Sequence, residues 1–121
     1  MLILVAHGSR DPVWRGSLEA LTRSVGDSLP GEEVRLAFMQ FTGPTLPEVV
    51  QDGLASGHTE FRILPLFMAS AGHVDKDVKP LVEELRSSHP RGRFQVLHPL
   101  GEDPLLPHLI VDILSRLSTQ G

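Results

Sequence analysis

The feature that most constrains the fold of this chain is the alternation of short apolar runs with segments of helical spacing. Four runs rich in branched and aromatic residues are bounded by turn residues, which is typical of β-strands. The segment after each run repeats apolar residues every three or four positions, which indicates an amphipathic helix. The predicted strands are residues 2–6, 34–41, 61–67 and 94–97. The predicted helices bury Trp14, Leu18, Leu21 and Val25; Leu46, Val49, Val50 and Leu54; Val74, Val78, Leu81, Val82 and Leu85; and Leu106, Leu109, Ile110, Ile113 and Leu117.

This alternation favours a parallel sheet, because right-handed crossovers place helices on both of its faces. We therefore predict an α/β fold, a three-layer flavodoxin-like domain with a four-stranded parallel sheet in the order 2-1-3-4. The chain has 121 residues, 40% of them hydrophobic, so we expect residues 1–121 to form a single domain. Asp103 followed by Pro104 predicts that the last helix begins at Pro104.

Composition excludes several classes of function. The formal net charge is −4 and the Lys and Arg residues are scattered, so no nucleic-acid partner is expected. The absence of cysteine excludes disulfides, thiolate metal sites and a cysteine nucleophile. No apolar run approaches the length of a membrane helix or a signal peptide, which predicts a cytoplasmic protein without a membrane partner. Nucleotide-binding glycine motifs do not occur, so no nucleotide cofactor is expected.

Two histidines follow predicted strands that would be neighbours in the sheet. His7 ends the first strand, and His73 lies in the loop after the third. The strand order opens a crevice at the carboxyl ends of these strands, and Gln40, at the end of the second strand, borders it. Two imidazoles and one oxygen ligand suit a borderline divalent ion such as Co²⁺, Fe²⁺, Ni²⁺ or Zn²⁺. The alternative is that the two histidines only hydrogen-bond the loops together.

The residues around the two histidines suggest a ligand-binding site. Ser9, Ser70 and Gly72 are small and would let a ligand approach the backbone closely. Arg10 and Lys76 flank the histidines and could pair with carboxylates of a ligand, although each could equally be a solvated charge. Asp75 and Asp77 are interpreted as complementing the start of the third helix.

The motif HGSR at residues 7–10 also resembles the arginine-histidine-glycine motif of histidine phosphatases. In that chemistry His7 would be the nucleophile of a phosphoester hydrolase. Ala6 stands where an arginine would grip the phosphate, so this hypothesis is the weaker one.

The segments LILVAHGSRDP, AFMQFTGPTLPEVV, ILPLFMASAGHVDKDVKPLVEEL and HPLGEDPLL occur in this order along nearly the whole chain. Together they resemble the short CbiX proteins, sirohydrochlorin cobaltochelatases related to CbiK and SirB and more distantly to haem ferrochelatase. The resemblance implies a chelatase-like domain that inserts Co²⁺, Fe²⁺ or Ni²⁺ into sirohydrochlorin or a related tetrapyrrole without ATP. It also implies a homodimer, because short members are similar to half of the longer chelatases.

The resemblance assigns metal binding and proton removal to His7 and His73. Relatives usually carry a glutamate where this chain has Gln40, and a glutamine offers a neutral oxygen but no base. Gln40 is therefore predicted to be a weak third ligand, and proton removal would fall to the histidines. The departure also supports a second hypothesis, a non-catalytic metal- or tetrapyrrole-binding protein descended from a chelatase.

Overall fold

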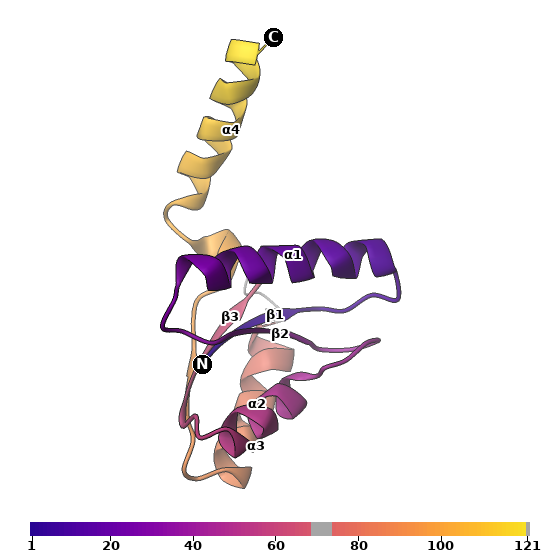
Figure 1. Cartoon of the computed structure of the whole chain (residues 1–121), viewed down its shortest axis with the longest axis vertical. Coiled ribbons are helices and arrows are strands. Elements are labelled where there is room, and N and C mark those ends of the chain that lie inside the picture. Colours follow the sequence, from indigo (N-terminus) through magenta and orange to yellow (C-terminus); the bar gives the residue numbers. More distant parts are fainter. Residues whose placement is uncertain (69–73, 121) are drawn as a thin grey trace.

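The centre of the molecule is a sheet of four parallel strands in the order β2-β1-β3-β4 (Figure 1). The computed structural model describes residues 1–68 and 74–120. It confirms the predicted α/β fold class and strand order. The elements are β1 (Leu2–Ala6), α1 (Pro12–Ser28), β2 (Val34–Phe38), α2 (Leu46–Ala55), β3 (Glu60–Pro65), a π-helical turn η1 (Val74–Val78), α3 (Lys79–Ser88), β4 (Arg93–Val96), a 3-10 turn η2 (Leu100–Glu102) and α4 (Leu106–Gln120).

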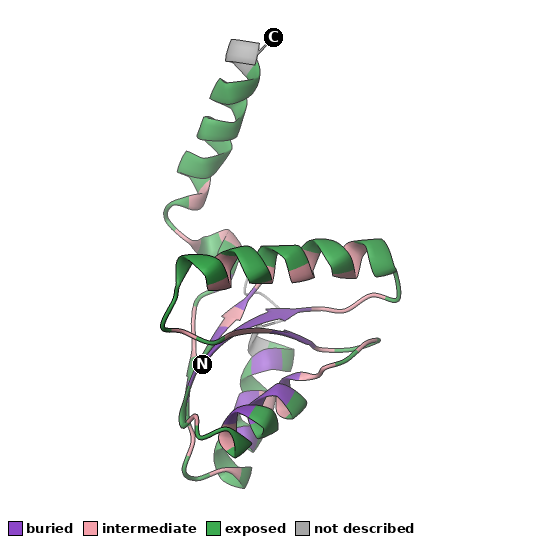
Figure 2. Cartoon of the chain, in the orientation of Figure 1, coloured by how far each residue is buried: buried purple, intermediate pink, exposed green. Residues whose placement is uncertain are grey.

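The two faces of the sheet are covered unequally. Alternate residues of a strand point to opposite faces, and Ile3 and Val5 lie in the larger core cluster with residues of α2 and α3. Leu2 and Leu4 lie in the smaller cluster, against which residues of α1 pack. The helices α2 and α3 lie below the sheet in Figure 1 and carry buried residues, whereas α1 above it has none (Figure 2). The α1 face is therefore the less completely covered one.

Two strands end earlier than their apolar runs suggest. β2 ends at Phe38 because the backbone N–H groups of Met39 and Gln40 both donate to the His7 carbonyl, at 3.1 and 2.9 Å. The chain thus turns over the end of β1 instead of extending to residue 41. β3 ends at Pro65, which has no N–H to donate to the ladder.

The last helix differs from the sequence prediction in two ways. It begins at Leu106, because the Asp103 carboxylate accepts from the Leu105 N–H at 2.8 Å and caps a turn that precedes the helix. The predicted burial of its apolar face is wrong, since residues 107–117 are all exposed. Figure 1 shows α4 projecting away from the rest of the molecule. Within residues 1–68 and 74–120, no helix has both the length and the apolar character needed to cross a membrane.

We expect Ile63→Ala to lower the free energy of unfolding by about 2–5 kcal/mol, because the side chain is 0% exposed and its loss leaves a cavity. The measurement is urea denaturation followed by circular dichroism. Val13→Ala is the matched control, since Val13 is 77% exposed on α1 and its truncation should change stability by no more than about 0.5 kcal/mol. Equal effects of the two substitutions would contradict the assigned core.

Candidate functional site

A polar cleft of about 400 Å³ lies where β1 and β2 end. It brings together three of the residues predicted from the sequence, namely His7, Gln40 and Lys76. His7 follows β1 directly, Gln40 lies two residues after β2, and Lys76 comes from η1. The remaining lining residues are Met39, Asp77, Pro80, Leu81 and Glu84.

The imidazole of His7 is half-buried and held by a stacking contact. Its ring lies over the ring of Phe67, with centroids 4.1 Å apart and planes inclined by 22°. Phe67 is itself only 4% exposed and belongs to the larger core cluster. Because Phe67 is buried, this stacking restrains the plane of the imidazole.

The loop that carries His7 packs tightly against the loop that carries Gln40. A Cβ atom placed on Gly8 would lie 1.7 Å from the carbonyl oxygen of Gln40, and the φ angle of Gly8 is +118°, a value that residues with a side chain rarely adopt. A glycine is therefore required at position 8. This close approach sets the distance between the two loops and hence the width of the cleft between His7 and Gln40.

Ser9 and Arg10 do not line this cleft. They border a neighbouring hollow together with Gly8 and Phe41, and the Arg10 guanidinium lies 5.5 Å from the centre of the Phe41 ring. The hydroxyl of Ser9 accepts from the Asp11 N–H at 3.0 Å, just before α1 begins. The structure thus places these two predicted substrate-binding residues beside the cleft.

Three predicted site residues lie outside the described part of the chain. These are Ser70, Gly72 and His73, so their placement is untested. Among residues 1–68 and 74–120, no group of three His, Asp or Glu side chains could hold a metal ion. The described donors of the cleft are consequently the imidazole of His7, the amide of Gln40 and two carboxylates.

Those carboxylates, on Asp77 and Glu84, were missed as site residues. Asp77 was interpreted only as a charge that complements a helix start. A signal was nevertheless present, because Asp77, Pro80, Leu81 and Glu84 follow the spacing i, i+3, i+4, i+7 and so share one helix face. That face lines the cleft, so two exposed carboxylates stand near the neutral Gln40.

Two of the other described histidines contact a carboxylate nearby. His58 contacts the Glu33 carboxylate at 2.6 Å, and His98 contacts that of Asp103 at 3.1 Å. The pKa of Asp103 is lowered, first by the hydrogen bond from the Leu105 N–H and then by the one from His98. His98 therefore supports the turn before α4, and it is not among the residues that line the cleft.

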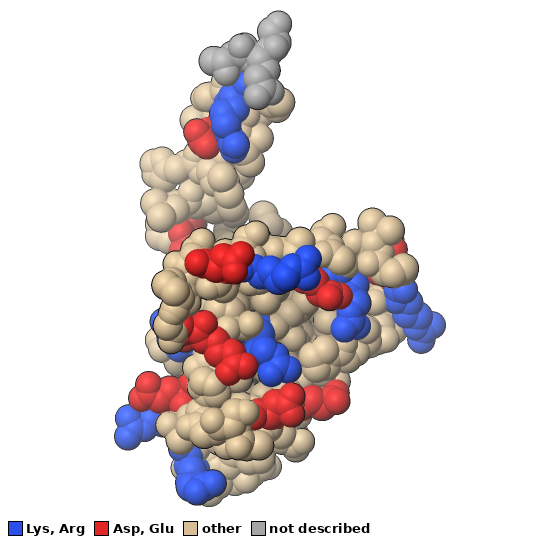
Figure 3. Space-filling view, viewed as in Figure 1, with Lys and Arg blue, Asp and Glu red and all other residues tan. Residues whose placement is uncertain are grey.

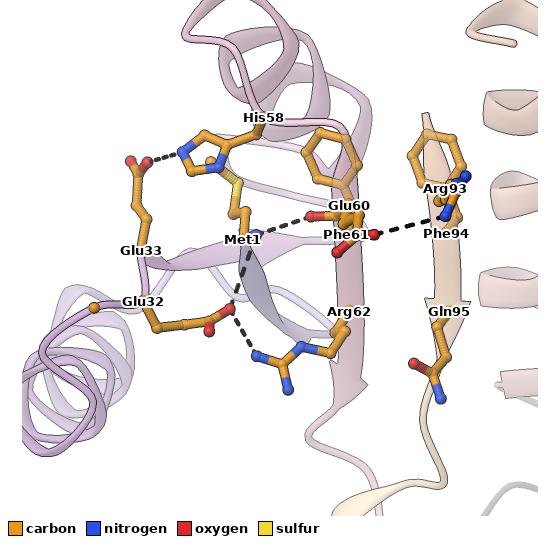
Figure 4. Close-up of a pocket in the computed structure, with 11 residues that line it drawn as sticks. Met1, Glu32, Glu33, His58, Glu60, Phe61, Arg62, Arg93, Phe94 and Gln95 are labelled. Atoms are coloured by element: carbon orange, nitrogen blue, oxygen red, sulfur yellow. Dashed lines mark hydrogen bonds and ion pairs between the residues drawn. The ribbon is translucent and has the colours of Figure 1, made fainter. Parts of the chain in front are cut away.

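A larger cavity, of about 510 Å³, lies at the opposite end of the sheet (Figure 4). Its charged side chains pair with one another: Glu32 bonds Arg62 at 2.7 Å, and Arg93 lies 3.8 Å from Glu60. The hydrogen bond from Arg62, together with its positive charge, holds the pKa of Glu32 below its ordinary value. Because these charges are already compensated, we assign this cavity a structural role.

Fold and site together define an α/β protein of the flavodoxin-like class, with a histidine-containing polar cleft at the carboxyl ends of β1 and β2. The chain belongs to the CbiX family, whose model matches residues 1–117.

Curated relatives carry the name sirohydrochlorin cobaltochelatase. The protein of Methanocaldococcus jannaschii is 30% identical over 88 residues, which cover 73% of this chain and 62% of that protein. The chain thus spans less than two thirds of the length of that relative. The protein of Methanococcoides burtonii is 26% identical over 120 residues, covering 92% of this chain and 91% of the relative.

Solved structures show the same fold. A CbiX protein of Marinobacter aquaeolei, described as a putative cobalamin biosynthesis protein, has a TM-score of 0.88 and 30% identity, covering 99% of this chain and 98% of that one. The sirohydrochlorin chelatase SirB of Bacillus subtilis, in complex with cobalt, has a TM-score of 0.75 and 22% identity, and this chain covers 50% of it. SirB with Fe³⁺ has a TM-score of 0.81 and 21% identity over 46% of its chain.

We expect Glu32→Gln to lower stability at neutral pH by no more than about 1 kcal/mol, as is usual for ion pairs near a surface. A lowered carboxyl pKa stabilises the fold at pH values above the pKa of the unfolded chain, near 4. The difference in the free energy of unfolding between wild type and variant should therefore shrink as the pH falls below that value and vanish below the folded-state pKa. Urea titrations from pH 7 to pH 3 measure it.

The variants Arg62→Gln and Glu32→Gln/Arg62→Gln complete a double-mutant cycle for this pair. Its coupling energy should follow the same course with pH. A coupling energy that stays constant down to pH 3 would contradict the assigned ion pair between Glu32 and Arg62.

Proposed function

We propose that this protein inserts a divalent metal ion, Co²⁺ or Fe²⁺, into sirohydrochlorin or a related tetrapyrrole without consuming a nucleotide. The observation that carries the proposal is the cleft at the carboxyl ends of β1 and β2, which gathers His7, Gln40, Lys76 and two carboxylates. Membership of the CbiX family and the names of the curated relatives support the substrate. The cobalt and Fe³⁺ complexes of SirB support the metals.

In this proposal the metal ion is a substrate, and its donors need to be firm enough to position it and weak enough to release it. The stacked imidazole of His7 supplies a nitrogen donor of fixed orientation, and Gln40 supplies a neutral amide oxygen. His73, which follows β3 in the sequence, is the second imidazole of the proposal. Pyrrole nitrogens then replace these donors one after another as the ion moves into the ring.

Insertion exchanges one divalent ion for two pyrrole N–H protons, so the cleft must accept two protons for each metal transferred. A neutral histidine nitrogen can accept one of them. The carboxylates of Asp77 and Glu84 border the same cleft and can accept a proton and pass it to solvent, because both are exposed. They supply the bases that Gln40 does not.

The peripheral carboxylates of the macrocycle need cationic partners. Lys76 lines the cleft, and Arg10 borders the adjacent hollow with Phe41. We propose that Lys76 pairs with one carboxylate, while Arg10 and the Phe41 ring contact the rim of the macrocycle.

Gln40 favours a second function, a binding protein that holds a metal ion or a tetrapyrrole without inserting one. A neutral amide neither attracts a cation as strongly as a carboxylate nor removes a proton. Turnover distinguishes the two functions, because a carrier binds its ligand stoichiometrically and does not speed up insertion.

We expect wild-type protein to accelerate Co²⁺ insertion into sirohydrochlorin, followed by the absorbance of the macrocycle. His7→Ala should lower the initial rate by about 10²-fold or more, because one side chain serves as both donor and base. Gln40→Glu should raise the rate by adding a charged ligand. Arg23→Ala, an exposed change on α1 remote from the cleft, is the control. Binding without acceleration over buffer would establish the carrier instead.

We expect Glu84→Gln to lower the insertion rate by less than His7→Ala does, because Asp77 remains as an alternative proton acceptor. Glu83→Gln is a matched control at the preceding position of α3, since Glu83 bonds Arg86 and does not line the cleft. The measurement is the same absorbance assay across pH 6–9. Equal rates for both variants and wild type would remove Glu84 from the mechanism.

A further inference from the structure

The segment HPLGEDPLL, residues 98–106, contributes no residue to the lining of the cleft. It contains the turn η2 between β4 and α4, and Leu106 is the first residue of the helix. Figure 1 shows α4 projecting away beyond this turn, and in the view of Figure 3 the helix meets the rest of the molecule at its base. The turn is therefore held mainly by contacts of its own and not by packing of the helix.

Internal bonds make this turn rigid. The His98 imidazole contacts the Asp103 carboxylate at 3.1 Å, which ties the two ends of the turn together. Between them, the Glu102 N–H donates to the Pro99 carbonyl at 2.9 Å. Gly101 lies inside this closed turn, so its position relative to the sheet is well determined.

Gly101 is pressed against the backbone that follows β3. Its N–H donates to the Phe67 carbonyl at 2.9 Å. A Cβ atom at position 101 would lie 1.8 Å from the carbonyl oxygen of Met68 and 2.2 Å from its Cα atom. No change of side-chain rotamer relieves such a contact, because the obstructing atoms belong to the backbone. A residue larger than glycine therefore has to push the turn and residues 67–68 apart.

This contact holds the chain at a point where the sheet no longer does. The pairing of β3 with β4 ends at Ile63, and its pairing with β1 ends at Pro65. One more bond to the sheet follows, from the N–H of Leu66 to a carbonyl of β1 at 2.8 Å. Phe67 lies beyond that bond, and there the N–H of Gly101 is the donor to the main chain.

Phe67 passes this constraint to the candidate site. Its ring stacks on the His7 imidazole, with centroids 4.1 Å apart, and its side chain is only 4% exposed. A displacement of the Phe67 backbone therefore displaces or tilts the ring against which the imidazole rests. The route from Gly101 to His7 consists of one hydrogen bond and one ring stack.

We propose that Gly101 is a positioning residue of the candidate site, which acts through the Phe67 ring on the orientation of the His7 imidazole. Replacing a residue that orients a metal ligand without touching the metal typically changes affinity or activity by about 10–100-fold. What the imidazole does once it is oriented rests on the proposed function, whereas the orientation itself is measurable without metal or tetrapyrrole.

The first test measures this orientation by NMR. The ring current of Phe67 should shift the carbon-bound proton signals of the His7 imidazole upfield, and His7→Ala identifies these signals by their loss. Gly101→Ala should reduce the shift. Gly53→Ala is the matched control, because its Cβ would lie 2.7 Å from the buried Phe61 ring near the amino end of β3, and it should leave the shift unchanged. An unchanged shift in Gly101→Ala would overturn the inference.

The second test measures Co²⁺ binding by isothermal titration calorimetry, without tetrapyrrole. Gly101→Ala should weaken binding by about 10–100-fold, and by no more than His7→Ala does. In a His7→Ala background, Gly101→Ala should cause no further loss, because it acts through His7. A further loss of similar size would show a general effect on the fold and would overturn the inference, as would an unchanged affinity after loss of the NMR shift.

If circular dichroism shows that Gly101→Ala does not fold, Phe67→Leu replaces it in both tests. It removes the ring and keeps the carbonyl that accepts from Gly101, so it should abolish the shift and weaken Co²⁺ binding. Phe61→Leu is its matched control, because Phe61 stacks on Phe94 at 5.2 Å in the same core cluster. Equal Co²⁺ affinities for Phe67→Leu and Phe61→Leu would overturn the inference.

Insertion kinetics separate this inference from the proposed function. In Gly101→Ala, kcat for Co²⁺ insertion should fall while KM for sirohydrochlorin stays near the wild-type value, because the turn does not line the cleft. If wild-type protein inserts no metal but the NMR shift and the Co²⁺ affinity respond as expected, the proposed function is wrong and the positioning role of Gly101 stands.

Discussion

β1 is hydrogen-bonded in parallel along both of its edges, and the positions of His7 and Gln40 in the cleft depend on this double pairing. All five of its residues are buried, and its neighbours β2 and β3 run in the same direction. The carboxyl ends of the three strands therefore meet at one end of the sheet. The His7 carbonyl, just beyond β1, accepts from the two residues that follow β2, so the second loop is tied to the first. Gly8 is required by this arrangement, because only a residue without a side chain fits against the Gln40 carbonyl.

The sequence was sufficient to predict the strands and the main helices, because periodicity reports which faces are buried. The strand order was predicted as the commonest arrangement for this alternation, and it is the one observed. β1 was predicted with its observed bounds. The errors occur where an end is set by contacts between loops. The apolar run after Val34 continues to Phe41, yet β2 stops at Phe38 since the next two N–H groups bond another loop. Hydrophobic spacing carries no information about such a contact.

The same distinction applies to the site. His7 was predicted because it follows a buried strand, and Gln40 because it lies at the end of the neighbouring second strand. Strand order alone brings the two near each other. Ser9 was assigned to the cleft from its position beside His7, but its hydroxyl bonds the Asp11 N–H, and the chain turns toward Phe41. Glu84 was not predicted as a site residue, because the apolar spacing of its helix indicates which face is buried and says nothing of what the polar face borders. A helix whose polar face borders a cleft has the same hydrophobic spacing as a helix whose polar face borders bulk solvent. Only the folded structure distinguishes the two.

Phe67 contacts both the imidazole of the candidate site and the turn that precedes α4. Its ring stacks on the His7 imidazole at 4.1 Å, while its carbonyl accepts from Gly101 at the base of α4. A change in the packing of Phe67 would therefore affect both the imidazole of His7 and the turn that precedes α4. The helical spacing of α4 was correctly predicted and its apolar face was wrongly assigned to the core, because periodicity reports that a face is apolar and not whether other elements of the fold cover it.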